Sequence, residues 1–325
     1  MGDGGIRWST GWEFKIVKFL LIGGGRQAKR YLETCAKIKS VEIVGLVTKN
    51  DSFVAKASIP AFESLDSALN SCSFNAVISA SKPEKQSVAL PFLIENRLPS
   101  IIEKPIMLSI DKNIGLSLSK TLEKCRDAPF LVNHLHLFHV GYQRFFNQIE
   151  HSNVARVEIF EGDFGPMRSF PSLFDWGPHA IGILFHIFGF NWVVEKVSMT
   201  VNEQNMGEVW CLDLFLDRSA KKKIEARLVF GNGFDAKTRQ ITISYDDGTK
   251  LNFDLIKDQI SSRLGGNRLL NTILKSQDPM EKLVRFFNSV IQSGVSSWPS
   301  ESLEISICAT EILHQIYEKR SGNFG

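Results

Sequence analysis

The chain has 325 residues, 43% of them apolar and 22% charged, which is an ordinary balance for a globular protein and argues against extensive disorder. Lys and Arg total 38 against 35 Asp and Glu, and the resulting net charge of +3 is too small to predict a nucleic-acid partner. Because domains usually hold about 100 to 200 residues, the length predicts two domains.

Features of the whole chain predict a cytoplasmic protein without a membrane segment. The five cysteines are odd in number, widely spaced and free of any C-x-x-C pair, which is typical of reduced thiols. Residues 1–14 lack the basic start and apolar core of a signal peptide, so we expect a short N-terminal extension. The most apolar later stretch, IGILFHIFGFNWVV from Ile181, is too short to span a bilayer and contains His186.

Between residues 15 and 133, short aliphatic runs alternate with amphipathic stretches. This alternation predicts βαβ units and a doubly wound parallel sheet of the Rossmann type, in an α/β domain. The predicted strands, in chain order, are KIVKFLLIG, VEIVGLV, NAVISA, PSIIEKP and PFLVNHL. Helices are predicted over residues 26–39, over SLDSALN, and over residues 85–96 and 111–125.

The pattern changes after residue 150 to longer alternating strands, such as ARVEIFEG, GEVWCLDLFL and KKIEARLVF. We therefore assign residues 134–325 to an α+β domain with an open, mainly antiparallel sheet, where DDG marks a hairpin turn. Helices are predicted over residues 279–292 and 300–319, the second with Ser300 as its N-cap. KKK at residues 221–223 is interpreted as a solvated hairpin edge.

A glycine-rich turn joins the first predicted strand to its helix. FLLIGGGRQAKRYLE places Gly23, Gly25 and Ala28 in G-x-G-x-x-A spacing. Such a turn lets the backbone approach a pyrophosphate, whose charge is met by helix N–H groups. The same spacing also occurs in βα turns without a ligand, but its place in the first βαβ unit favours a dinucleotide.

The end of the second predicted strand carries Thr48, Lys49 and Asn50, where the residue that contacts the adenosine ribose is expected. An acidic side chain there would repel a 2'-phosphate, whereas hydroxyl, ammonium and amide groups can all donate to it. The stretch therefore favours NADP over NAD. In the alternative interpretation, Lys49 is a solvated loop lysine and Asp51 contacts the ribose.

Two further stretches place polar side chains beside apolar runs. In PSIIEKPIMLS, Glu103 and Lys104 directly follow a strand that is predicted to be buried. Burying two charges costs free energy unless they are paired or have a function. In the alternative interpretation, the strand simply reaches the surface at Glu103. FDWGPHAIGILFHIFG predicts a helix from Pro178 to Gly189 with His179 in its first turn. The positive end of the helix dipole would keep His179 neutral, so that it could accept a proton from a substrate hydroxyl or return one. In the alternative interpretation, His179 has only a structural role as a hydrogen-bonded histidine, which is the more common role for a single histidine outside such a motif.

Gly23 to Ala28, the Glu-Lys-Pro stretch at residues 103–105 and DWGPH at residues 175–179 together resemble the Gfo/Idh/MocA family, named for glucose-fructose oxidoreductase and inositol dehydrogenase. The closing stretches FFNSVIQSG and SLEISICATEILHQIYEKRSG are also similar to that family. The resemblance implies an NAD(P)-dependent enzyme that transfers hydride to or from a CH–OH group of a sugar, cyclitol or nucleotide-linked sugar. It further implies a homodimer or homotetramer formed through the C-terminal sheet, with the last helix packing back on the N-terminal domain.

The resemblance also implies roles for individual residues. Lys104 would face the nicotinamide and the substrate hydroxyl, often beside a cis peptide to the proline, and Glu103 would orient it. His179 would be the catalytic histidine, and Asp175 would contact the substrate or orient His179. The implied cofactor contacts are Gly23, Gly25, Arg26, Gln27, Ala28, Thr48, Lys49, Ser81, Glu103 and Lys104.

Three residues depart from the family pattern. Gly182 stands where D-x-G-x-H-x-x-D ends in a carboxylate, Gln86 where many members have a histidine, and Leu137 near the arginine of an Arg-Phe pair. The departures indicate an altered substrate or an inactive relative. Two alternatives therefore stay open: an NADP-binding regulator or sensor without turnover, and a reductase similar to biliverdin reductase.

NHLHLFH contains His134, His136 and His139, and strand alternation would put the first two on one face. No Cys, Asp or Glu stands near enough to complete an obvious ligand set, so no metal site is predicted and packing or substrate contact is favoured. His186 follows His179 by seven residues on a similar helix face and is interpreted as a core histidine.

Overall fold

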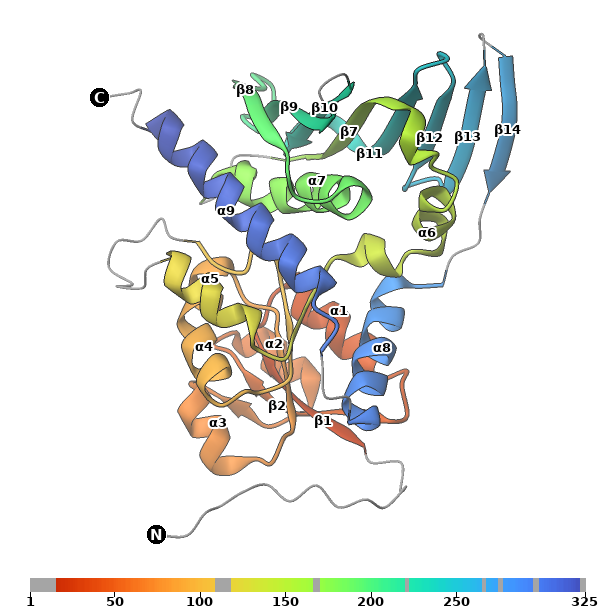
Figure 1. Cartoon of the computed structure of the whole chain (residues 1–325). Helices are drawn as coiled ribbons and strands as arrows, with labels where there is room; N and C mark the ends of the chain where they lie inside the picture. The colour runs from red at the N-terminus through yellow and green to blue at the C-terminus, as the bar shows by residue number, and fades with distance from the viewer. Residues whose placement is uncertain are drawn as a thin grey trace.

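The computed structural model describes residues 16–108, 118–165, 170–219, 222–264, 267–273, 277–294 and 298–321. Within these ranges the chain folds around two sheets, one above the other in Figure 1. The extension predicted over residues 1–14, the start of the helix predicted over 111–125, and Lys221 lie outside the described residues.

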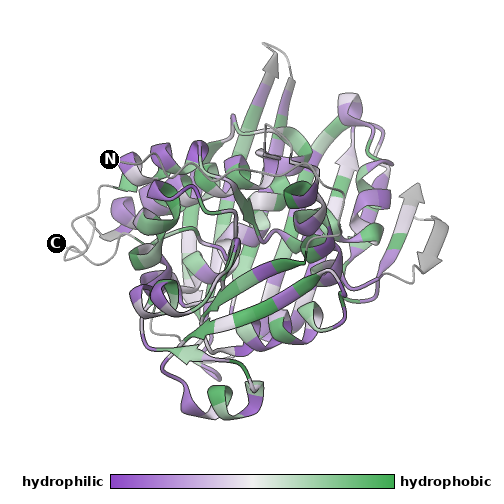
Figure 2. Ribbon diagram, turned by 90° about the horizontal axis from the view of Figure 1, so that it is seen from below, coloured by the Kyte–Doolittle hydropathy of each residue, from purple (hydrophilic) through white to green (hydrophobic). Residues whose placement is uncertain are grey.

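The first sheet is parallel, with the strand order β3-β2-β1-β4-β5-β6. Its strands form because short aliphatic runs can be buried on both faces, and Figure 2 shows them as largely hydrophobic. The strands are β1 Val17–Ile22, β2 Val41–Val47, β3 Ala61–Phe62, β4 Ala76–Ser79, β5 Ser100–Ile102 and β6 Phe130–Val132. The helices are α1 Arg26–Cys35, α2 Asp51–Ala57, α3 Leu65–Ser71, α4 Pro83–Glu95 and α5 Leu118–Arg126. The predicted doubly wound Rossmann sheet is confirmed.

The second sheet has eight strands in the order β14-β13-β12-β11-β7-β10-β9-β8, and only its β7–β10 pair is parallel among the described strands. Its strands are β7 Val154–Phe164, β8 Val193–Val201, β9 Glu208–Ser219, β10 Lys222–Gly231, β11 Gly233–Tyr245, β12 Lys250–Asp254, β13 Gln259–Leu264 and β14 Asn267–Ile273. Gly248, with φ of +83°, makes the predicted turn between β11 and β12. The mainly antiparallel second sheet is therefore confirmed.

Helices tie the two sheets together. α7 (Ser172–Phe188) packs on the inner face of the second sheet, with α6 (Val140–Phe146) and the 3₁₀ turns η2 (Leu135–Phe138) and η3 (His151–Asn153) beside it. α8 (Pro279–Ser293) lies against α1 and places Phe287 beside Phe19 of β1. α9 (Glu301–Ser321) runs between the sheets, because Leu303 and Ile307 join the core of the first sheet and Leu313 that of the second.

Two local predictions were wrong. The helix predicted from Pro178 begins at Ser172, so Pro178 lies inside α7 and His179 is two turns from its start. Burial of Leu173 and Phe174 stabilises these added turns and offsets the hydrogen bond that proline cannot donate. The stretch around His134 and His136 is not a strand, because β6 ends at Val132 and η2 follows.

Candidate active site

Most of the predicted site residues lie where the parallel strands end. Gly23 follows β1, Ser81 lies just beyond β4, and Glu103 follows β5, at neighbouring carboxyl ends. The strand order reverses between β1 and β4, which is the point where open α/β sheets bind ligands. The fold therefore brings the glycine turn and the Glu-Lys-Pro stretch to one edge of the sheet.

The glycine turn has the geometry that a pyrophosphate requires. Gly23 has φ of +123°, and a Cβ there would lie 2.5 Å from the carbonyl oxygen of Ala80, so only glycine fits. Gly25 is the N-cap of α1, carries no capping side chain, and has nothing within 4 Å of its Cβ position. The residues present thus fit a dinucleotide, whose phosphates would meet the first N–H groups of α1.

The loop after β2 is tied directly to this turn. Asn50 donates from Nδ2 to the carbonyl of Gly24 at 2.7 Å, and its own N–H donates to Thr48 Oγ1 at 3.1 Å. A Cβ on Gly24 would lie 2.3 Å from Thr48 Oγ1, so the loop packs on the turn. Lys49 is exposed beside it, and Asp51 begins α2.

Glu103 is buried and accepts from three donors, two on α1 and one just after β6. Its Oε1 accepts from Gln27 Nε2 at 3.3 Å, from the Tyr31 hydroxyl at 3.0 Å, and from Asn133 Nδ2. Burial and the Glu103 carboxylate raise the pKa of Tyr31 well above its usual range, so the phenol stays a donor. Gln27, predicted as a cofactor contact, is thus bound to Glu103.

Gln86 holds the Glu-Lys-Pro stretch in place. It is 1% exposed on α4, and its Nε2 donates to the carbonyls of Glu103 at 2.6 Å, Pro105 at 2.9 Å and Ile106 at 3.0 Å. Its Oε1 accepts from the Ser79 hydroxyl at 3.1 Å. The peptide between Lys104 and Pro105 is cis, as the family resemblance implied. This positioning role was missed in the sequence, where Gln86 stood out only as a departure.

Lys104 is half-buried, and its Nζ donates to the carbonyl of Asn133 at 3.0 Å. Burial lowers the pKa of Lys104 below its ordinary 10.5, while Glu103 opposes that shift and Arg239 adds to it. Asp175 also acts on this pKa, although it comes from α7, which packs on the second sheet. An ammonium group in this setting gives up its proton more easily than one in water.

His179 approaches Lys104 from α7. Burial lowers the pKa of His179 well below its ordinary 6.5, and the nearby Lys104 lowers it further. The predicted cause, the positive helix end, is wrong because His179 lies two turns inside α7. Asp175 is one turn earlier on the same helix face, so Lys104, Asp175 and His179 come together.

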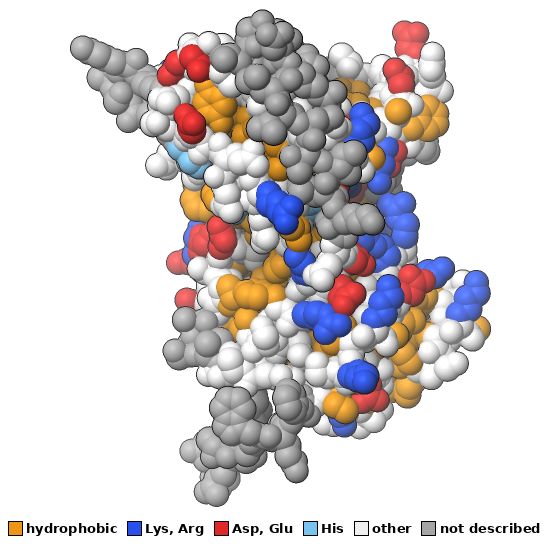
Figure 3. All heavy atoms as spheres, turned by 90° about the vertical axis from the view of Figure 1, so that its right-hand side faces the viewer, with side chains coloured by type: hydrophobic (Ala, Val, Ile, Leu, Met, Phe, Trp, Pro, Cys, Tyr) orange, Lys and Arg blue, Asp and Glu red, His pale blue; other side chains and the backbone are white. Residues whose placement is uncertain are grey.

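A cleft of about 440 Å³ runs from the glycine turn to the second sheet. It is lined by Arg26, Gln27, Arg30, Asp163, Phe164, Gly165, Trp176, Asn232, Lys237 and Arg239. Figure 3 shows Lys and Arg side chains gathered at the level where the two domains meet. The cleft is rich in cations and joins the predicted cofactor turn to the helix that carries His179.

Several of these cleft residues were missed in the sequence. The Arg239 guanidinium lies 5.7 Å from the Trp176 ring, and its Nε is 3.8 Å from Oε2 of the buried Glu161. Trp176 is 7% exposed, and its indole N–H is buried without a hydrogen-bond partner in the structure. The alternation of ARVEIFEG would have placed Glu161 on the inward face with Val157 and Ile159.

Comparison with known proteins gives a family match for the N-terminal part of the chain. Residues 17–123 match the model of Gfo/Idh/MocA, the oxidoreductase family with an NAD-binding Rossmann fold. This N-terminal part of the chain is therefore similar to the Gfo/Idh/MocA oxidoreductases. No curated protein sequence matches the chain.

Solved structures share the fold of this chain. KijD10, a 3-ketoreductase from Actinomadura kijaniata solved with TDP-benzene and NADP, has a TM-score of 0.76 at 14% identity, covering 92% of this chain and 96% of its own. The dehydrogenase MviM from Clostridium difficile has a TM-score of 0.75 at 17% identity, covering 94% and 100%. A protein from Magnetospirillum magnetotacticum described as a candidate oxidoreductase has a TM-score of 0.73 at 21% identity, covering 92% and 98%.

The structure explains the departure from the Gfo/Idh/MocA pattern at Gly182. A Cβ at Gly182 would lie 2.9 Å from both Cε1 and Nδ1 of His134, and 3.3 Å from Cγ2 of Ile305. The imidazole of His134 therefore occupies the space that a side chain at this position would need. In this chain, a buried imidazole lies where the Gfo/Idh/MocA pattern has a carboxylate.

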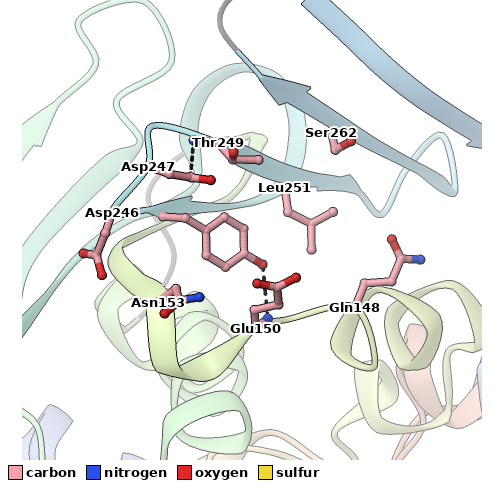
Figure 4. A pocket seen from close by; sticks show the side chains of 9 residues that line it. Gln148, Glu150, Asn153, Asp246, Asp247, Thr249, Leu251 and Ser262 are labelled. Carbon is pink, nitrogen blue, oxygen red and sulfur yellow. Dashed lines mark hydrogen bonds between the residues drawn. The ribbon is translucent and has the colours of Figure 1, made fainter.

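The other large cavity, of about 460 Å³, contains none of the predicted site residues (Figure 4). It is lined by Gln148, Glu150, Asn153, Tyr245, Asp246, Asp247, Thr249, Leu251 and Ser262.

Among the described residues, no group of three or more His, Cys, Asp or Glu could hold a metal ion. Within the same residues, no helix is long and apolar enough to cross a bilayer.

We expect the imidazole of His179 to stay neutral when the pH falls to its ordinary pKa of 6.5, because burial and Lys104 both disfavour the cation. Because the unfolded chain takes up this proton near pH 6.5 and the folded protein only at lower pH, His179 lowers the free energy of unfolding as the pH falls below about 6.5. NMR titration of the ring resonances checks this. A ring that is half protonated at pH 6.5 would contradict the described environment.

Proposed function

We propose that the chain is an NADP-dependent enzyme that transfers a hydride between nicotinamide and a secondary alcohol or ketone of a sugar, cyclitol or nucleotide-linked sugar. The observation that carries the proposal is that Lys104 and His179, both with lowered pKa values, come from different domains to one place. A cleft beside them is lined by Trp176 of the helix that carries His179 and by Arg26 and Gln27, which follow the glycine turn.

The chain's own residues supply the proton chemistry in this proposal, and the cofactor, when bound, supplies or accepts the hydride. The Lys104 ammonium stabilises developing negative charge on the substrate oxygen. Neutral His179 accepts the hydroxyl proton during oxidation and returns it during reduction. Asp175 orients His179, and Glu103 with Gln86 keeps Lys104 at the strand end.

The loop after β2 supports NADP as the cofactor. Thr48, Lys49 and Asn50 stand beside the glycine turn, whereas Asp51 is already in the first turn of α2. NADPH should bind several-fold more tightly than NADH, and Thr48→Asp should shift the preference toward NADH, because a carboxylate repels a 2'-phosphate. Calorimetry measures both affinities.

A matched pair of lysines controls this test. Lys49→Ala should weaken NADPH binding, whereas Lys56→Ala, at the far end of α2, should not. Equal affinities for the two cofactors in the unmodified protein would contradict the preference for NADP.

The cleft supports an anionic sugar derivative as substrate. Lys237 and Arg239 line the cleft across from the glycine turn, and the Trp176 indole N–H is available as a donor to a hydroxyl group. Of the similar structures, KijD10 was solved with TDP-benzene, a nucleotide derivative. Nucleotide-linked sugars are therefore the first compounds to test, and nicotinamide absorbance in the presence of a panel of sugars and sugar nucleotides is the assay.

A second candidate is a nucleotide-binding sensor without turnover, because Gly182 removes the last carboxylate of the family pattern. Tight NADPH binding without an absorbance change on any panel compound would favour the sensor.

Two further proposals concern assembly and location. The outer face of the second sheet, away from α7, carries the half-buried Phe160, Phe215 and Val229 among charged residues, which supports self-association of two chains through this face. Sedimentation that shows only monomers would contradict it.

All five cysteines are free thiols, which supports a cytoplasmic location. Disulfides in the native protein would contradict that location.

A further inference from the structure

Two buried histidines, His134 and His136, and the half-buried His186 lie in a line outside the proposed catalytic set. The ring centroids of His134 and His136 are 5.4 Å apart, and those of His136 and His186 are 6.1 Å apart. His134 and His136 are 0% and 5% exposed. They come from the segment after β6, and His186 comes from the last turn of α7.

The inner end of this line lies at the candidate active site. Lys104 and His179 both interact electrostatically with His134, since the charge of Lys104 lowers the pKa of His134 and that of His134 lowers the pKa of His179. His134 can occupy this place because residue 182 is glycine. Its Nε2 is within hydrogen-bond distance of the Ser306 hydroxyl on α9.

The outer end of the line reaches solvent at Glu301. The Tyr142 hydroxyl lies 2.8 Å from His186 Nδ1, and His186 Nε2 lies 3.5 Å from Glu301 Oε1. Burial raises the pKa of Tyr142, so the phenol remains protonated and can donate to Nδ1, which leaves an Nε2–H facing the carboxylate. The side chain of Glu301 is 66% exposed.

Packing alone does not account for two ring nitrogens in this line. Nδ1 of His134 and Nε2 of His136 are both buried without a hydrogen-bond partner. An unpaired buried polar atom costs about 1–3 kcal/mol, and phenylalanine would fill the same space without that cost. Proton transfer requires hydrogen bonds between successive groups, and these unpaired ring nitrogens are free to form them, directly or through a water molecule.

We propose that His134, His136, Tyr142 and His186 form a proton relay that connects the Lys104–His179 site with Glu301 and bulk water. The relay rests on the proposed hydride-transfer function. During oxidation, the C–H bond breaks as hydride moves to NADP⁺, and the hydroxyl proton passes to His179 or Lys104. Each imidazole accepts a proton on one nitrogen and releases another from the other nitrogen. The Tyr142 hydroxyl gives its proton to His186 Nδ1 as it takes one from His136, and Glu301 passes the proton released by His186 to water. Reduction runs the line in reverse.

The electrostatics of the line suit this role. The pKa values of His134, His136 and His186 are all lowered, chiefly by burial, so each imidazolium is a transient that gives its proton up. The other titratable groups that act on His136 are Lys104 and His139, which both lower its pKa. Only Glu301, at the outer end, raises the pKa of His186 and draws the proton outward.

Exchange of the His134 ring N–H with D₂O tests the relay directly. The full chain, with isotope-labelled histidine and excess NADPH to cover the cleft, is moved into D₂O and followed by NMR. We expect exchange within seconds in the unmodified protein. His186→Phe should slow it at least about tenfold, because exchange must then wait for local opening. Glu301→Gln should also slow it, and this change on an exposed side chain leaves the core intact.

His314→Phe is the matched control, since His314 is a buried histidine on α9 that packs against Phe174 outside the line. It should leave the exchange rate unchanged. The relay would be overturned if the His134 N–H of the unmodified protein exchanged as slowly as the core amides. It would also be overturned if both relay variants exchanged at the rate of the unmodified protein. The measurement involves no substrate, so a chain that oxidised no sugar would contradict the proposed function without changing this result.

Discussion

Lys104→Ala and His179→Ala are each expected to lower turnover of a true substrate by at least about 10²-fold, because a positioned acid–base group typically contributes about 10² to 10⁴. NADPH affinity should change only by a small factor, since the glycine turn that holds the pyrophosphate is intact in both variants. Asp175→Asn should give a smaller loss, because Asp175 orients His179 and transfers no proton. Steady-state kinetics and calorimetry measure the two effects separately.

Lys85→Ala is the control for Lys104→Ala, because Lys85 is an exposed lysine on α4. It should keep normal kinetics. Near-normal rates in both the Lys104 and His179 variants, on a substrate that the unmodified protein clearly turns over, would remove the proposed mechanism. The Glu-Lys-Pro stretch would then be only a strand end that reaches the surface.

Gln86→Leu is expected to lower the free energy of unfolding by about 2–4 kcal/mol, because several buried polar groups lose their partner at once. The carbonyls of Glu103, Pro105 and Ile106 and the hydroxyl of Ser79 all bond to this one amide. Turnover should fall as well, since Lys104 is part of the segment that Gln86 holds. Urea denaturation gives the stability change.

Gln143→Leu is the matched control, because Gln143 is exposed and makes a single hydrogen bond to the carbonyl of Leu137. Its effect should stay within about 0.5 kcal/mol. If the two leucine variants unfold at the same urea concentration, the amide of Gln86 does not hold the segment in the way its contacts indicate.

The first sheet and the glycine turn could be predicted because their signals are local. Aliphatic runs buried on both faces and a G-x-G-x-x-A turn need no knowledge of distant residues. The start of α7 was wrong for the same reason: Pro178 is a good first residue of a helix, and only the burial of Leu173 and Phe174 in the folded core shows that the helix begins earlier.

The candidate site was only partly predictable because its positioning contacts are long-range. Glu103 is held by Gln27, Tyr31 and Asn133, and Arg239 meets Glu161 across two strands of the second sheet. Nothing local in the sequence pairs such residues. The missing carboxylate at residue 182 was visible in the sequence, but that His134 occupies its space follows only from the packing of η2 on α7.

The most direct test of the proposed function follows deuterium from the cofactor to the substrate. The protein is incubated with NADPH that carries deuterium at the hydride position, together with a panel of keto sugars and nucleotide-linked keto sugars, and the products are analysed by mass spectrometry. We expect one product that is a single deuterium heavier at a secondary carbon, formed at least about 10²-fold more slowly by Lys104→Ala. Tight NADPH binding with no deuterium in any compound of the panel would contradict hydride transfer and favour the sensor.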